Sequence, residues 1–162
     1  MALIEPFNAL MGELDYPMFI VTANATGERS GCLVGFATQT SIHPPRFVVC
    51  ISVKNHTFHV ARAAAHLGVH LVPADAADLA QVFGGETGDE VDKFAEVDWH
   101  EGPEDVPIVE RCGNWFVGRV LERFDTGDHH AFLLEPVAAE HGTAGDEFTF
   151  HRAKRIHPGH EP

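Results

Sequence analysis

The stretch from Gly31 to Pro45 constrains the fold most, because it joins an apolar segment, four small polar residues and a double proline. Residues Val34 to Ala37 carry little polar side chain, so a ligand there would meet backbone N–H and C=O groups. Thr38 to Ser41 add side-chain donors, and Pro44-Pro45 favours extended backbone before the next apolar run. Such a surface suits a planar, phosphorylated ligand with amide groups along its edge.

Composition narrows the class of protein. The 162 residues, 44% of them hydrophobic, suffice for one domain with a buried core. A net charge of −13 with only 11 Lys and Arg argues against nucleic-acid binding, which needs clustered cations. No apolar run approaches the ~20 residues of a membrane span, and no leader-like segment opens the chain. We therefore expect a cytoplasmic protein that does not enter membranes.

The spacing of cysteine and histidine argues against metal chemistry. Cys32, Cys50 and Cys112 are scattered without a C-x-x-C motif, and we interpret them as small core residues in a reducing compartment, with a redox role as the alternative. Among the 12 histidines, His56 and His59 could share a helix face, but no third ligand stands at a fixed interval. The sequence therefore predicts no metal site.

Apolar periodicity predicts a mainly β fold with short helices. Steps of three and four between Leu3 and Leu14 predict an amphipathic helix in residues 1–15, which would cover a sheet face or a partner subunit. Apolar, β-branched runs predict six strands, at Met18–Ala23, Ser30–Phe36, Phe47–Val53, Val69–Val72, Asn114–Phe124 and His129–Val137. Short helices are expected over Phe58–His66 and from Asp75 or Asp78 to Gly84-Gly85. The polar tail, 153–162, is expected to be loosely ordered.

Three segments carry candidate functional residues. Lys54 to Thr57 precede a helix that Thr57 can cap, and the helix N-terminus with Lys54 could bind an anion; a capped helix alone is the alternative. Lys93 and Phe94 stand out in the acidic, loop-like segment from Gly84 to Glu104, where they could be a charged residue and a core anchor on a short helix. His129 and His130 begin a strand, so their side chains alternate and at most one serves a ligand.

Five motifs in order resemble a known family. Small apolar residues are followed by T-x-x-S-x-x-P-P at Thr38, Ser41 and Pro44-Pro45. A lysine-led loop ending in threonine (54–57), Asp-Lys-Phe (92–94), Gly-Asp-His (127–129) and Phe-His-Arg (150–152) come later. From about Tyr16 to Arg152 the chain thus resembles the flavin reductase-like family of FMN-binding split β-barrels.

The resemblance implies a split-barrel domain over 16–152 and a homodimer that binds FMN, or FAD, at the subunit interface. Hydride would come from NADH or NADPH, and the reduced flavin would pass to a monooxygenase component. Because the backbone platform lies immediately upstream of the helix N-terminus at residues 54–57, we assign the flavin phosphate to this segment. The implied site residues are His129 for catalysis and, for flavin binding, Leu33, Val34, Gly35, Phe36, Ala37, Thr38, Ser41, Lys54, Asn55, His56, Thr57, Lys93 and Phe94.

One departure supports an alternative function. Many family members have Asn-Ser-Phe where this chain has Gly35-Phe36-Ala37, so side-chain hydrogen bonds to the flavin would be lost and backbone ones kept. The alternative is a flavin-binding carrier, electron-transfer protein or sensor without reductase activity. A third reading, a β-barrel without a cofactor, requires the matching segments to be coincidence. Because no G-x-G-x-x-G is present, a nicotinamide nucleotide would stack against the exposed flavin face without a binding unit of its own.

Overall fold

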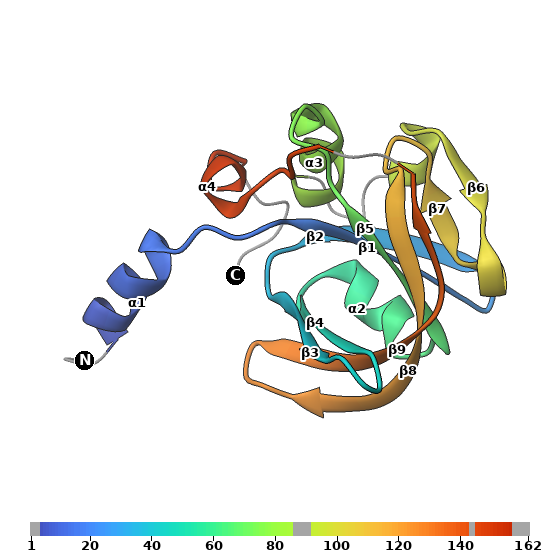
Figure 1. Ribbon diagram of the computed structural model, residues 1–162, viewed down its shortest axis with the longest axis horizontal. Coiled ribbons are helices and arrows are strands. Elements are labelled where there is room, and N and C mark those ends of the chain that lie inside the picture. The colour runs from blue at the N-terminus through green and yellow to red at the C-terminus, as the bar shows by residue number, and fades with distance from the viewer. Residues whose placement is uncertain (1–3, 86–91, 143–144, 157–162) are drawn as a thin grey trace.

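The computed structural model of the protein describes residues 4–85, 92–142 and 145–156. Seven antiparallel strands form one sheet in the order β2-β1-β5-β8-β9-β4-β3, and β6 pairs separately with β7. The strands are β1 (Phe19–Ala25), β2 (Glu28–Val34), β3 (Ala37–Ser41), β4 (Arg46–Ser52), β5 (His66–Leu71), β6 (Trp99–Glu101), β7 (Pro107–Val109), β8 (Asn114–Asp125) and β9 (His129–His141). The sheet curls around the short helix α2 (His56–Ala61), which Figure 1 shows inside the curve. This architecture confirms the predicted mainly β fold with short helices.

Two apolar clusters stabilise the two faces of the curled sheet. Alternate side chains of β1, β4, β5 and β9, among them Val21, Val49 and Leu67, are fully buried in the inner cluster with Val60 of α2. The second cluster packs α3 (Ala77–Gly85) against the outer side of β1. Because each cluster draws on strands far apart in sequence, burial of apolar surface closes the curl.

The start of α2 differs from the sequence prediction. Asn55, rather than Thr57, is the N-cap, because its side chain accepts a hydrogen bond from Thr57 N–H at 2.9 Å. The Thr57 hydroxyl is instead buried against Ser30 Oγ at 2.8 Å. The helix ends at Ala61 rather than His66, since His66 already pairs with Arg119 in the sheet.

Several elements were not predicted. Residues 37–41 form strand β3, and residues 42–45 form a turn where the prolines favoured extended backbone. The acidic segment contains strand β6, which was not predicted, and a 3-10 turn at Lys93–Ala95, which agrees with the interpretation of Lys93 and Phe94 as residues of a short helix; residues 86–91 lie outside the described part of the chain. At the C-terminus, the tail predicted to be loosely ordered begins inside helix α4 (Phe150–Ala153), and residues 157–162 also lie outside the described ranges.

The N-terminal helix α1 (Ile4–Glu13) extends away from the rest of the molecule (Figure 1). None of its residues is buried, although its apolar positions recur at helical spacing. The large apolar side chains exposed on and just after it are Ile4, Phe7, Leu10, Met11 and Leu14. An isolated helix of this length is marginal in water, so α1 needs a surface to pack against.

Candidate functional site

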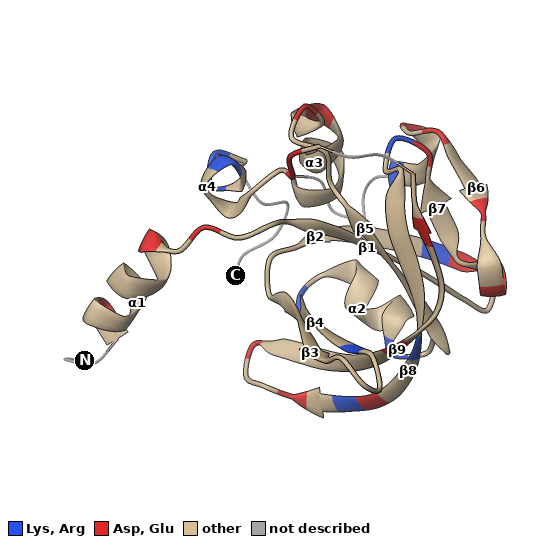
Figure 2. Cartoon of the chain, in the orientation of Figure 1, with Lys and Arg blue, Asp and Glu red and all other residues tan. Residues whose placement is uncertain are grey.

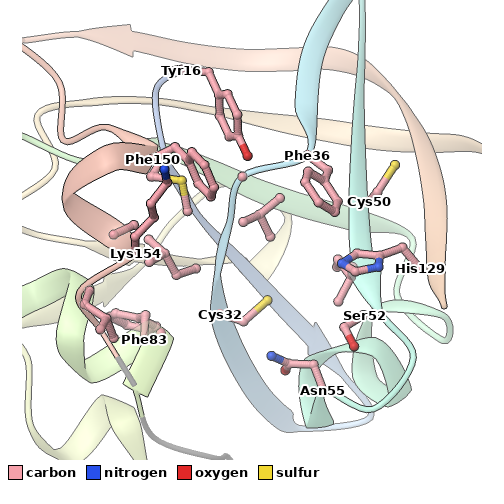
Figure 3. A pocket seen from close by; sticks show the side chains of 18 residues that line it. Tyr16, Cys32, Phe36, Cys50, Ser52, Asn55, Phe83, His129, Phe150 and Lys154 are labelled. Carbon is pink, nitrogen blue, oxygen red and sulfur yellow. The ribbon is translucent and has the colours of Figure 1, made fainter. Parts of the chain in front are cut away.

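A cavity of about 300 Å³ opens between the end of β2, the end of β4 and helix α4. This volume falls at the lower end of the range for small-molecule sites. The lining residues are Tyr16, Met18, Cys32, Leu33, Val34, Gly35, Phe36, Cys50, Ile51, Ser52, Asn55, Phe83, Gly84, His129, Phe150, Ala153, Lys154 and Ile156. Figure 3 shows Phe36, Ser52, Asn55 and His129 on one side of this pocket and Phe150 and Lys154 on the other.

The first side of the pocket is a backbone platform between β2 and β4. Gly35 and Phe36 lie between β2 and β3, outside both strands, and Phe36 C=O accepts a hydrogen bond from Cys50 N–H at 2.8 Å. The side chains around this crossing are small or apolar, which leaves peptide groups accessible to a ligand. Phe36 itself is 55% exposed, and a large aromatic side chain exposed at the mouth of an apolar pocket is a typical ligand contact.

His129 lies beside Phe36, with 4.8 Å between the ring centroids. Its Nδ1 is 2.7 Å from Asp128 Oδ1, and this hydrogen bond lowers the pKa of the Asp128 carboxyl. An ionised carboxylate only accepts, so Nδ1 donates and the Asp128 contact orients the ring. The turn is tied to β4 because Val53 N–H donates to Asp128 C=O at 3.0 Å. His130 packs instead against Phe58 and Phe132, so the two histidines face different surroundings, as strand alternation predicts.

The second side of the pocket joins the two ends of the described chain. The rings of Tyr16 and Phe150 stack with centroids 4.7 Å apart and planes 12° apart. Backbone pairing sets this contact, because Phe150 N–H donates to Tyr16 C=O at 2.9 Å and Met18 N–H donates to Phe148 C=O at the same distance. The Lys154 ammonium lies 5.1 Å from the Phe150 ring centroid. No pattern in the sequence pointed to Tyr16, Phe150 or Lys154 as residues of the site.

The four residues from Lys54 to Thr57 are not brought together in the pocket. Asn55 lines it, while Thr57 is buried beneath β2. His56 Nε2 lies 2.6 Å from Glu28 Oε1, in an ion-pair geometry at the surface. Lys54 is exposed in the turn after β4.

Of the other residues predicted to bind the flavin, some line the pocket and some lie outside it. Leu33, Val34, Gly35 and Phe36 line the pocket. Thr38 and Ser41 lie on β3 outside the lining, and the Thr38 hydroxyl donates to Gln39 C=O at 3.3 Å. Ala37 packs against the inner apolar cluster.

Lys93 and Phe94 lie below the pocket rather than in its wall. Lys93 is buried, and its ammonium donates to Gly31 C=O at 3.1 Å and to Phe83 C=O at 3.0 Å. Phe94 packs edge to face against Phe83 and Trp99. Both residues therefore hold β2 and α3 together behind the pocket, in the manner of core anchors.

Two of the three cysteines face the pocket as protonated thiols. Burial raises the pKa of Cys32 to about 11, and burial also raises the pKa of Cys50. Cys112, in the outer cluster, has a pKa raised by burial to about 12. All three are free cysteines, and as neutral thiols Cys32 and Cys50 are small apolar residues of the pocket wall, while Cys112 is a small core residue.

Residues 4–85, 92–142 and 145–156 contain neither a metal-ligand cluster nor a membrane-spanning helix. No group of three or more His, Cys, Asp or Glu side chains in those ranges is arranged to hold a metal ion. None of the helices in the same ranges has the length and apolar character that crossing a bilayer requires.

Comparison with known proteins relates the whole domain to one family. The family model described as "Flavin reductase like domain" matches residues 11–158. The chain is 28% identical over 151 residues to the reductase component of a 4-nitrophenol 4-monooxygenase/4-nitrocatechol 2-monooxygenase from Rhodococcus opacus, covering 93% of this chain and 79% of that protein. It is 24% identical to an FMN reductase (NADH) from Acinetobacter baylyi, covering 85% and 72%. A flavin reductase domain protein from an Arthrobacter species has the same fold, with a TM-score of 0.84, 23% identity and coverage of 93% and 92%.

Proposed function

The chain belongs to the flavin reductase-like domain family, and from this membership we propose that it is an NAD(P)H:flavin oxidoreductase. It transfers hydride from NADH or NADPH to FMN or FAD. The observation that carries this proposal is the pocket between β2, β4 and α4, whose platform lies within the sequence motif of the family. The split β-barrel that the motifs imply is the fold of its structural relatives.

The residues of the pocket fit a flavin. Its walls are mostly apolar, as the faces of a planar aromatic ring system require, and peptide groups at Gly35 and Phe36 suit the polar edge of that ring. A bound flavin supplies the ring that accepts the hydride. The protein binds and orients this ring and excludes water from it.

His129 is the side chain proposed to contact the reacting rings. Its support is its place in the pocket lining, its ring contact with Phe36 and the Asp128 carboxylate that fixes its orientation. An imidazole held in this way can donate or accept a hydrogen bond at the flavin or the nicotinamide.

The flavin phosphate is proposed to lie by Lys54 and Asn55. Asn55 is in the lining, and the exposed Lys54 precedes it in the turn after β4. Thr57 and His56 support this segment through Ser30 and Glu28. Lys93 and Phe94 act indirectly, because they fix the strand and helix behind the pocket.

We also propose a homodimer in which α1 packs against a second copy of the chain. The support is the exposed apolar face of α1, which has no apolar counterpart buried against it within the described residues. Transfer of the reduced flavin to a monooxygenase component is proposed from the similarity to the Rhodococcus reductase component.

Anaerobic absorbance titration tests the proposed activity. The purified protein is titrated with FMN and with FAD, and NADH or NADPH is then added. We expect the visible flavin band to bleach faster than it does in the same mixture without protein. If the protein shifts the flavin spectrum but accelerates bleaching with neither donor, the reductase function is refuted and a flavin carrier or sensor takes its place.

A further inference from the structure

The glycine at position 35 is explained by the space around it. Its backbone does not require a glycine, because its φ lies outside the left-handed region. A Cβ at Gly35 would lie 3.0 Å from Tyr16 Cε2 and 3.1 Å from Met18 Sδ. Two carbon atoms normally come no closer than ~3.5 Å, so a side chain at position 35 would displace the Tyr16 ring. Gly35 thus leaves the room in which this ring lies beside the backbone platform.

The Tyr16 residue is held in this position from both sides of its backbone and by its ring. Its N–H donates to Asp15 Oδ1 at 3.1 Å, and its C=O accepts from Phe150 N–H at 2.9 Å. The ring stacks on that of Phe150, with the planes 12° apart. The hydroxyl at the far end of the ring therefore has a fixed place at the pocket.

The Tyr16 hydroxyl points into the pocket, toward the space between Phe150 and Phe36 (Figure 3). It makes no hydrogen bond to any residue in the described part of the chain. Burial, with a contribution from the Asp15 carboxylate, raises the pKa of Tyr16, so the hydroxyl is a neutral donor near pH 7. A ligand that displaces water from this hydroxyl must supply a new partner for it.

The platform next to this hydroxyl offers a ligand only peptide groups. Gly35, Phe36 and Ala37 carry no polar side chain. A polar ring edge that lies against this segment can receive a side-chain hydrogen bond only from a neighbouring element. Tyr16 is the donor that Gly35 admits to this end of the platform.

We propose that the Tyr16 hydroxyl donates a hydrogen bond to the polar edge of the flavin ring, and that Gly35 is needed to let it do so. This assignment rests on the proposed flavin reductase function, which places the flavin ring at the platform. Tyr16 then supplies the side-chain donor that residues 35–37 lack. Its role is to bind and orient the ring, and it takes no part in hydride transfer.

The Tyr16→Phe variant tests this bond, because it removes the hydroxyl and keeps the ring that stacks on Phe150. Riboflavin binding to the full chain is measured by equilibrium dialysis. We expect the Kd to rise about fivefold, as loss of one neutral hydrogen bond predicts. Thr40→Val is the matched control, because it removes an exposed hydroxyl on β3 outside the lining and should keep the wild-type affinity. An unchanged Kd in Tyr16→Phe, or an equal rise in Thr40→Val, would overturn the proposal.

Lumiflavin shows which part of the flavin accepts the bond, because it has the same ring system with a methyl group in place of the ribityl chain. If the Tyr16 hydroxyl meets the ring edge, Tyr16→Phe weakens lumiflavin and riboflavin binding by the same factor. A loss for riboflavin with none for lumiflavin would place the bond on the ribityl chain and refute the assignment to the ring.

The role of Gly35 is tested by Gly35→Ala in the same assay. The added methyl group should displace the Tyr16 ring and raise the Kd for riboflavin about fivefold. In the Tyr16→Phe background the same change should cost little more, since the hydroxyl is already absent. Losses that multiply in the double variant would show that the two residues act independently and would contradict the role given to Gly35.

The titrations need no electron donor, so this proposal and the reductase function fail in different ways. A wild type that binds riboflavin but does not reduce it refutes the reductase function, while the comparison with Tyr16→Phe still decides the hydrogen bond. A wild type that reduces flavin, together with an equal riboflavin affinity in Tyr16→Phe, refutes only the hydrogen bond. Absence of flavin binding by the wild type refutes both.

Discussion

Replacing His70 by asparagine should remove a large part of the acid sensitivity of folding. His70, on β5, is fully buried between two other strands. Its Nδ1 donates to Ile20 C=O at 2.9 Å, and its Nε2 accepts from Val109 N–H at 3.1 Å. Only the neutral imidazole can make both bonds, because a protonated ring has no acceptor. The fold therefore selects the uncharged form.

The size of the effect follows from the pKa of His70. Burial lowers this pKa from 6.5 to about 4; the bond to Ile20 opposes the change and nearby His100 adds to it. Between pH 6.5 and about 4 the unfolded chain binds a proton that the folded chain does not, so stability falls as the pH falls. At roughly 1.4 kcal/mol for each pKa unit, the full loss is about 3 kcal/mol, of which about 2 kcal/mol appears between pH 6.5 and 5.

The assay is urea unfolding of wild type and His70→Asn at several pH values from 7.5 to 5. The variant is expected to be less stable at pH 7, since it loses a packed ring and alters both hydrogen bonds. The informative quantity is the difference between the two free energies of unfolding, in which contributions from the other histidines cancel. This difference should shrink by about 2 kcal/mol from pH 6.5 to 5. A difference that stays constant with pH would refute the assignment of the proton linkage to His70.

Three other substitutions test the site, the proposed dimer and the packing. His129→Ala should lower kcat/KM for the nicotinamide donor about tenfold in stopped-flow assays, with exposed His43→Ala as control; equal rates would exclude a contact at the reacting rings. Leu10→Glu should convert a dimer to a monomer in analytical ultracentrifugation, whereas Asn8→Glu adds the same charge elsewhere on α1 and should not. Gly68→Ala should lower the free energy of unfolding by about 2 kcal/mol, because its Cβ would meet Val106 Cγ1 at 2.8 Å; Gly12→Ala, with open space around it, should cost nothing.

The sequence predicted the features that depend on local periodicity. Alternating apolar residues predicted the long β8–β9 hairpin, and the same alternation separated His129 from His130. Helical spacing predicted α1 with its apolar face. The backbone platform at Gly35 and Phe36 could also be predicted, because residues beside a strand that lack polar side chains leave their peptide groups accessible to a ligand.

Features that depend on contacts between distant segments could not be predicted. Tyr16 and Phe150 meet only because the strand-like segments before β1 and before α4 pair, and neither segment has a periodic signal of its own. A lysine in an acidic segment is expected at the surface, yet Lys93 is buried, and its ammonium donates to the carbonyl groups of Gly31 and Phe83 on other elements. Asn55 and Thr57 can both cap a helix, and the partner that decided between them was Ser30 on β2.

The distribution of charged residues over the surface favours the binding of anionic ligands at the pocket. Acidic residues spread over β6, the first turn of α3 and the turn between β8 and β9, while basic residues gather around α4 (Figure 2). Flavin and nicotinamide nucleotides are anions, so most of this surface repels them. Of these cations, Lys154 lies in the pocket lining, and Arg152 and Arg155 lie close to it in the chain but outside the lining. The acidic surface thus disfavours non-specific nucleotide binding, and Lys154 supplies the local attraction that directs these ligands to the pocket.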